Sequence, residues 1–269
     1  MTTRPEKPIR IAIHGAAGRM GQRLVALAVS DSELQLVAAI DRPDHPRQAD
    51  DAGAVAGIGT IGVPLSSCLS AEVDVLVDFS QPAACEGIVE ACLARRIPAV
   101  VATTGLAREQ MQVLHAAARQ IPLLWAPNMS RAVNLVMKLA HLAAAALKDQ
   151  DADVEVLERH HRFKEDAPSG TALRFGEIIA AVMGQSAERH GREGRPGRRP
   201  HAEIGYHAIR AGDNPGEHTI LFGMLGETIE LTVRATNRDC YALGALAAAK
   251  FLVGKPAGWY AMSDVLGIG

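Results

Sequence analysis

Short apolar runs alternate with amphipathic segments through the first half of the chain. Each run is rich in Val, Ile, Leu and Ala and is followed by a polar, glycine or proline residue, which is typical of buried parallel strands. The strands predicted from these runs are Ile9–His14, Leu34–Ile40, Asp74–Phe79, Ala99–Ala102 and Ile121–Ala126. The helices predicted between them are Gln22–Ser30, Pro82–Ala94 and Arg108–Arg119. This alternation predicts an α/β domain, a Rossmann-type doubly wound parallel sheet.

The pattern changes after residue 131. Two longer amphipathic segments, Val133–Lys148 and Gly170–Met183, predict helices. The further predicted strands are Val154–Glu158, Glu203–Arg210, Glu217–Met224 and Glu227–Ala235. Most of these alternate apolar and polar positions, as strands do in a sheet with one face against helices. We therefore predict a C-terminal α+β domain with a mixed, largely antiparallel sheet.

A chain of 269 residues suits two domains. We predict that residues 1–131 form the Rossmann-type domain and residues 132–240 the second domain. The last helix, Ala242–Val253, is expected to return to the first domain, so that residues 241–269 complete it.

Composition and charge exclude several classes of partner. The net charge of −2 and the 4% of aromatic residues argue against nucleic acid, and no apolar stretch is long enough to span a membrane. The start of the chain is polar, and the four cysteines lack metal-site spacing, so we expect a reduced, cytoplasmic protein. The basic segment 188–199 is either a solvated linker or a mobile loop that brings positive charge to an anionic ligand.

A glycine-rich turn follows the first strand and indicates a dinucleotide site. The turn consists of Gly15, Ala16, Ala17, Gly18, Arg19, Met20 and Gly21. Glycines of this kind permit a tight turn, a close approach to pyrophosphate and close helix packing, and the helix amides then face the phosphates. Asp41 ends the second strand, where a carboxylate accepts from ribose hydroxyls, and Arg42 could receive a 2′-phosphate. The pair favours use of NADH, NADPH or both.

Two later strand ends should face the same ligand, because ligands in such sheets lie at the carboxyl ends of the strands. They are the segments Ala102, Thr103, Thr104 and Ala126, Pro127, Asn128, Met129. Their small, hydroxyl and amide side chains suit the nicotinamide end of the cofactor.

The densest chemical signal lies between Glu158 and Ala172. His160, His161 and Lys164 are followed by a predicted helix start at Gly170 and Thr171. Cations beside helix amides bind carboxylate or phosphate, and His or Lys can deliver a proton near neutral pH. A small dianionic substrate follows from this chemistry. Metal binding by the two histidines is disfavoured, since adjacent strand residues point to opposite faces, and we predict no metal.

These motifs together resemble the bacterial 4-hydroxy-tetrahydrodipicolinate (dihydrodipicolinate) reductase family. The resemblance rests on GAAGRMG, VDFSQP, ATTG, RHHRFKEDAPSGTA and RAGDNPGEHT, which spread over nearly the whole chain. It implies reduction of the cyclic dicarboxylate 4-hydroxy-tetrahydrodipicolinate with NADH or NADPH, in diaminopimelate and lysine biosynthesis. It also implies a homotetramer built through the sheet of the second domain, which would hold substrate.

The resemblance further implies roles for individual residues. His160 and Lys164 would be catalytic proton donors, and His161, Gly170 and Thr171 would hold substrate. The turn from Gly15 to Met20 would cradle pyrophosphate, Asp41 and Arg42 would contact the adenosine ribose, and the two later strand ends would line the nicotinamide. The residues that carry these cofactor contacts are Gly15, Ala16, Ala17, Gly18, Arg19, Met20, Asp41, Arg42, Ala102, Thr103, Thr104, Ala126, Pro127, Asn128 and Met129.

Two positions depart from the family pattern, because the family usually has Gly at Ala102 and small or aliphatic residues near Arg131. Two other functions stay open at this point. One is another NAD(P)-dependent dehydrogenase, which acts on a small anionic amino acid or a semialdehyde. The other is a dinucleotide-binding regulator without catalysis, although His160 and Lys164 count against it.

Overall fold

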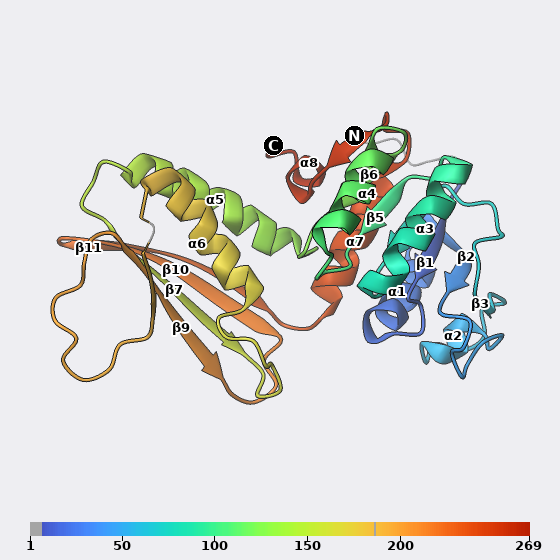
Figure 1. Ribbon diagram of the computed structural model, residues 1–269. Coiled ribbons are helices and arrows are strands. Elements are labelled where there is room, and N and C mark those ends of the chain that lie inside the picture. The colour runs from blue at the N-terminus through green and yellow to red at the C-terminus, as the bar shows by residue number, and fades with distance from the viewer. Residues whose placement is uncertain (1–6, 186) are drawn as a thin grey trace. The chain divides into compact units, whose positions relative to one another are not determined.

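The computed structural model of the chain describes residues 7–185 and 187–269 (Figure 1). Contacts within it separate two units. The first holds the described residues up to Arg131 together with Asp239–Gly267, and the second holds Ala132–Arg238. None of the helices in the described part of the chain is both long and apolar enough to cross a membrane.

The first unit contains a seven-stranded sheet in which every strand runs parallel, in the order β12-β6-β5-β4-β1-β2-β3. Its strands are β1 (Ile9–His14), β2 (Leu34–Ile40), β3 (Leu65–Ser66), β4 (Val75–Asp78), β5 (Ala99–Val101), β6 (Pro122–Trp125) and β12 (Gly258–Tyr260). The chain adds strands on one side of β1 and then continues from β4 on the other. The order therefore reverses at β1, where ligands bind in sheets of this class.

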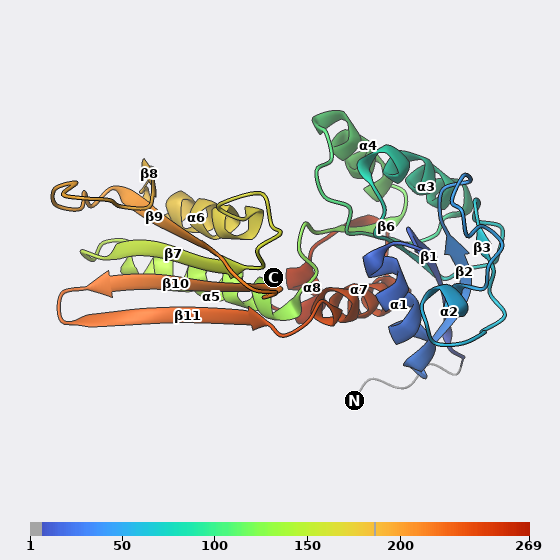
Figure 2. The ribbon, with the colours of Figure 1, turned by 90° about the horizontal axis from the view of Figure 1, so that it is seen from below.

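Helices cover both faces of this sheet (Figure 2). They are α1 (Arg19–Ser30), α2 (Ala52–Val55), α3 (Pro82–Arg95), α4 (Arg108–Ala118), α7 (Asp239–Leu252) and α8 (Met262–Leu266). In β1, Ile11 and Ile13 enter the core with α1 and α7, while Ala12 enters the core with α3 and α4. Strands buried on both faces explain the continuous apolar runs. The doubly wound prediction is confirmed.

The second unit is a five-stranded mixed sheet in the order β11-β10-β7-β9-β8. Its elements are α5 (Arg131–Leu147), β7 (Asp153–His160), α6 (Gly170–Met183), β8 (Ala187–His190), β9 (Glu203–Arg210), β10 (Gly216–Met224) and β11 (Glu227–Ala235). Both β7 and β8 pair parallel to β9, and β10 pairs antiparallel to β7 and β11. The predicted mixed sheet is confirmed.

Both α5 and α6 lie on one face of this sheet (Figure 1). Along β7 the buried residues are Val154, Val156, Glu158 and His160, so these side chains share the face toward the helices. Two of the four, Glu158 and His160, are titratable, and they lie at the end of β7, next to a core that is otherwise apolar.

Several local predictions are wrong. The last helix begins at Asp239 and not at Ala242, and the strand predicted to end at Glu158 runs to His160. Two other errors concern the glycine-rich turn and the basic segment. The helix after the glycine-rich turn begins at Arg19 and not at Gln22, because the carbonyl of Gly18 already accepts from the amide of Gln22 at 2.9 Å. Residues 188–190, predicted as part of a basic loop, belong to β8 and pair with β9. Short elements such as α2, β3, β12 and α8 carry too few residues to show a period.

Candidate active site

The glycine-rich turn joins β1 to α1 in the first unit. The amides of Gly15 and Ala16 donate to the carbonyl of Ile40 at 2.8 and 3.0 Å, and Gly18 donates to Gly15 at 3.1 Å. These bonds hold the turn against β2. Within the helix, the backbone amides of the first turn of α1, which begins at Arg19, have no carbonyl partner in the preceding turn. These amides can therefore bind an anion.

Two glycines of this turn are required by its packing. A Cβ on Gly15 would lie 2.5 Å from the Phe79 carbonyl oxygen, and one on Gly21 would lie 2.0 Å from the Gly15 carbonyl oxygen. Gly15 also has a φ of 77°, which favours glycine. A Cβ on Gly18 would lie 3.2 Å from the Gly15 carbonyl oxygen, which is closer than an ordinary contact, so the turn would have to shift slightly to admit a side chain there.

Asp41, directly after β2, is hydrogen-bonded to the glycine-rich turn. One carboxylate oxygen accepts from the Ala17 amide at 2.9 Å, and the other accepts from the Arg42 amide at 2.9 Å. The Arg42 guanidinium is exposed and lies 3.5 Å from Asp44. Each carboxylate oxygen retains acceptor capacity, so Asp41 can still bind a hydroxyl.

The two later strand ends differ in what they present. Ala102 and Thr103 are buried, and Thr104 is exposed. After β6, Pro127 is exposed, whereas Ala126 is buried and Met129 belongs to the core with 1% exposure. The Met129 side chain therefore packs the core, and the predicted contact could come only from its backbone.

A buried polar network joins the carboxyl ends of β1, β4 and β5. Asp78, with 0% exposure, has one oxygen 2.7 Å from His14 Nδ1, and its other oxygen accepts from the Thr103 hydroxyl at 2.6 Å. The Ser80 amide donates to the first oxygen at 3.2 Å. The Trp125 indole donates to the Thr103 carbonyl at 3.2 Å. Thr103, a predicted cofactor residue, is thus fixed on two sides.

In the second unit, Glu158 joins residues from two strands, β7 and β9, and the start of a helix. One carboxylate oxygen lies 2.6 Å from His160 Nδ1, and the carboxylate accepts hydrogen bonds from both terminal nitrogens of Arg210 at 2.7 Å. It also accepts from the Ser169 amide at 3.0 Å. Burial lowers the pKa of His160, while the hydrogen bond and charge of Glu158 raise it; burial is the larger effect.

The start of α6 lies beside these residues. Ser169 is the N-cap, and its hydroxyl accepts from the Ala172 amide at 3.2 Å and lies 3.1 Å from His218 Nε2. The positive end of the helix dipole thus lies next to Gly170 and Thr171. Burial lowers the pKa of His218 to about 4, so this ring is neutral at neutral pH.

His161 and Lys164 follow β7 in the segment before α6. His161 Nδ1 is buried and makes no hydrogen bond within the described structure. The Lys164 ammonium donates to Asp166 at 2.6 Å and is about a fifth exposed, with 21% of its side chain accessible. An unpartnered imidazole nitrogen and an accessible ammonium near a helix start fit an anionic ligand. In the described part of the chain, no group of three or more metal-ligating side chains is arranged to hold an ion.

Sequence reasoning assigned no role to His14, Asp78, Glu158, Arg210 or His218. Strand register brings them together as two separate groups, one in each unit: His14 pairs with Asp78 in the first, and His160 pairs with Arg210 in the second. Glu158 precedes His160 by two residues on one strand, so the sequence alone places them on one face. That spacing was the signal available for Glu158.

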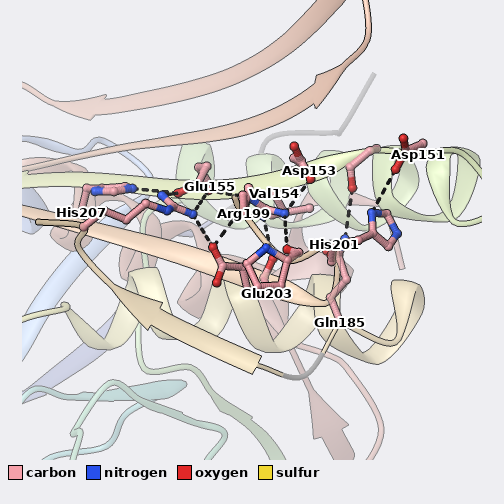
Figure 3. Close-up of polar contacts among 12 residues, drawn as sticks. Asp151, Asp153, Val154, Glu155, Gln185, Arg199, His201, Glu203 and His207 are labelled. Atoms are coloured by element: carbon pink, nitrogen blue, oxygen red, sulfur yellow. Dashed lines mark hydrogen bonds and ion pairs between the residues drawn. The ribbon is translucent and has the colours of Figure 1, made fainter. Parts of the chain in front are cut away.

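The basic segment is tied down and is not a free linker. Arg192 and Arg199 both contact the Glu155 carboxylate, at 2.7 and 2.9 Å, and Arg192 also pairs with Glu203 (Figure 3). His207 Nε2 lies 2.7 Å from Glu155. These two arginines already have carboxylate partners, which leaves them less suited to bind a ligand.

Comparison with known proteins agrees with this arrangement. The family model for the N-terminus of dihydrodipicolinate reductase matches residues 9–129, and the model for its C-terminus matches residues 132–266. The chain belongs to the dihydrodipicolinate reductase family.

Relatives in this family match along their whole length. A 4-hydroxy-tetrahydrodipicolinate reductase from Rhodopirellula baltica is 58% identical, with 97% of each chain covered. One from Alkalilimnicola ehrlichii is 48% identical, with 96% of this chain and 99% of the relative covered. The dipicolinate-bound dihydrodipicolinate reductase from Paenisporosarcina sp. TG-14 is 28% identical, with a TM-score of 0.78, and the match covers 96% of this chain and 98% of that one.

Proposed function

We propose that the chain reduces 4-hydroxy-tetrahydrodipicolinate to tetrahydrodipicolinate in diaminopimelate and lysine biosynthesis: NADH or NADPH gives a hydride, a proton is taken up, and the 4-hydroxyl group leaves as water. Membership of the reductase family over both halves of the chain carries this conclusion. We assign dinucleotide binding to residues 1–131 with 241–269, and substrate binding to residues 132–240.

The first unit fits a dinucleotide. The glycine-rich turn and the amides at the start of α1 suit a pyrophosphate, and Asp41 can accept from a ribose hydroxyl. The buried Asp78 network holds Thr103 at the nicotinamide end. When bound, the cofactor supplies the hydride. The protein's part is to fix these groups in place before binding, which lowers the entropy cost.

The second unit fits a dicarboxylate. The start of α6 at Gly170 and Thr171 and the Lys164 ammonium supply positive potential for its carboxylates, and His161 offers a ring nitrogen for a hydrogen bond. His160 is held by Glu158 and can deliver a proton from its other ring nitrogen. Such proton delivery contributes about 10²–10⁴ in rate. Lys164 is placed to assist as a second donor.

The alternatives lose support. A dehydrogenase that uses a cysteine nucleophile needs an accessible thiolate, but burial raises the pKa of Cys85 and of Cys92 to about 12. Burial also raises the pKa of Cys240, and the exposed Cys68 follows β3 at the edge of the first sheet, away from the strand at which the order reverses. A regulator without catalysis has no need of the Glu158–His160 arrangement.

We also propose a cytoplasmic homotetramer. All four cysteines are free thiols, as a reducing compartment favours. Opposite the helices, the second sheet presents Leu157, Leu221 and the 46% exposed Ile209 among paired charges. This face suits burial against another copy. In an ultracentrifuge the wild type should have four times the 28.5 kDa chain mass, and Ile209→Glu should lower it. A monomeric wild type would contradict this assembly.

Kinetics of two variants test the proposed residues. Substrate is generated in situ from pyruvate and aspartate semialdehyde by the upstream synthase, and cofactor absorbance is followed. His160→Gln and Lys164→Ala should each lose about 10²-fold or more in kcat. NADH affinity, measured by fluorescence titration, should stay unchanged. Arg174→Ala removes an exposed pair on α6 and serves as the control. Full activity in both site variants would overturn the assignment.

A further inference from the structure

The carboxylate of Glu158 is buried, with 1% exposure, yet its charge is compensated on every side. Arg210 binds both of its oxygens, the Ser169 amide binds one, and His160 Nδ1 lies against the other. A buried carboxylate with this many donors keeps its charge, and its pKa lies below the ordinary value despite burial. Glu158 is therefore a permanent acceptor beside the His160 ring.

This acceptor determines which His160 nitrogen is available. A carboxylate only accepts, so Nδ1 must carry a hydrogen to bond it at 2.6 Å. In the neutral ring, Nε2 then holds the lone pair, and in the charged ring Nε2 holds the exchangeable proton. A Cβ on Gly216 would lie 2.9 Å from Nε2, so the missing side chain keeps space at this nitrogen.

Groups from each neighbouring element face the ring. They are Glu158 on β7, Arg210 on β9, His218 on β10 and Lys164 in the segment before α6. The His218 ring meets His160 edge-on, with centroids 5.2 Å apart, and bonds the N-cap Ser169 instead of His160. The carboxylate of Glu158 is thus the group that holds the His160 ring by a hydrogen bond.

We infer that Glu158 is a positioning residue, which fixes His160 with Nε2 as the nitrogen that exchanges the substrate proton. Arg210 serves Glu158 in turn, because its two parallel bonds set the plane of the carboxylate. That the substrate receives this proton rests on the proposed function, whereas the orientation of the His160 ring does not.

The same strand supplies a matched control. Glu155 also contacts one histidine and two arginines, among them His207 and Arg199 (Figure 3). It lies three residues before Glu158 and so on the opposite face of β7. Removal of either charge breaks a comparable network of ion pairs. Of these two glutamates, Glu158 is the one that contacts His160.

The first test is a nitrogen-15 NMR titration of the histidines in the wild-type protein, with His160 assigned by the loss of its signals in His160→Gln. In the neutral ring we expect the hydrogen on Nδ1. In Glu158→Gln the population with this tautomer should fall, while Glu155→Gln should leave it unchanged. A neutral His160 with its hydrogen on Nε2 in the wild type would overturn the inference. This readout needs no substrate, so it is independent of the reaction.

The second test is the pH dependence of turnover. Glu158→Gln should lower kcat by about 10²-fold. Because the negative charge supports the protonated ring, the decline of kcat at high pH should also begin at lower pH. Glu158→Asp should recover part of kcat, and circular dichroism checks that each variant is folded. Equal losses in Glu155→Gln and Glu158→Gln would reduce Glu158 to a structural role. A wild type that is inactive but has the expected tautomer would contradict the proposed function alone.

Discussion

Replacement of Asp78 by Asn tests the polar network at the carboxyl end of the first sheet. The carboxylate is fully buried and bonds His14, Thr103 and the Ser80 amide at 2.7, 2.6 and 3.2 Å. An amide keeps one acceptor oxygen and places a donor against a donor at the other position. A hydrogen bond to a charged group contributes about 1.5–3 kcal/mol, and an unpaired buried donor costs about 1–3 kcal/mol. We expect the free energy of unfolding of the first unit to fall by about 3 kcal/mol.

Asp74, just before the same strand, offers a control, since it pairs with Arg10 in a partly exposed position, with 32% and 38% of the two side chains accessible. Asp74→Asn should cost less than about 1 kcal/mol. The two tryptophans, Trp125 and Trp259, both lie in the first unit, so their fluorescence during urea unfolding reports on it. Asp78→Asn should also weaken NADH binding through Thr103. Equal stability of the two variants, with unchanged NADH affinity, would refute the reasoning.

Three further perturbations have defined outcomes. His218 is neutral when folded and has a pKa of about 4 instead of 6.5, so protons bind the unfolded chain first as pH falls. The free energy of unfolding therefore falls by about 3 kcal/mol as the pH drops from 6.5 to 4, because His218 takes up a proton in the unfolded chain first. In His218→Gln, the free energy of unfolding measured with urea should change less with pH over this range, and an unchanged dependence on pH would contradict the reasoning. Gly21→Ala drives a Cβ to 2.0 Å from the Gly15 carbonyl, so NADH affinity and thermal stability should both fall; an unaltered melting temperature would count against this packing. Arg42→Ala should raise the KM for NADPH about tenfold and leave that for NADH within about twofold, and equal effects would show that Arg42 does not bind a 2′-phosphate.

Much of the fold could be predicted because its signals are local. Long periodic segments such as Leu34–Ile40 and Gly170–Met183 appear with the predicted bounds. Short elements were missed because too few residues show a period. The start of α1 was misplaced because its N-cap is Gly18, which bears no side chain to mark it.

The candidate site was only partly accessible to sequence reasoning. His160 and Lys164 stand in a dense local motif, but Arg210 and His218 enter through strand register between distant segments. Register is set by the whole sheet, so no local pattern reveals it. The same holds for Asp78, whose partners come from the end of β1 and from the segment after β5.

The transfer of hydrogen from cofactor to substrate tests the central claim most directly. The wild type would be incubated with in situ substrate and with NADH or NADPH deuterated at the transferable position of nicotinamide C4, and the product mass determined. We predict that cofactor oxidation depends on substrate, and that tetrahydrodipicolinate gains one deuterium for each cofactor oxidised. No oxidation, or oxidation without deuterium in this product, would contradict the assignment as a reductase of this substrate.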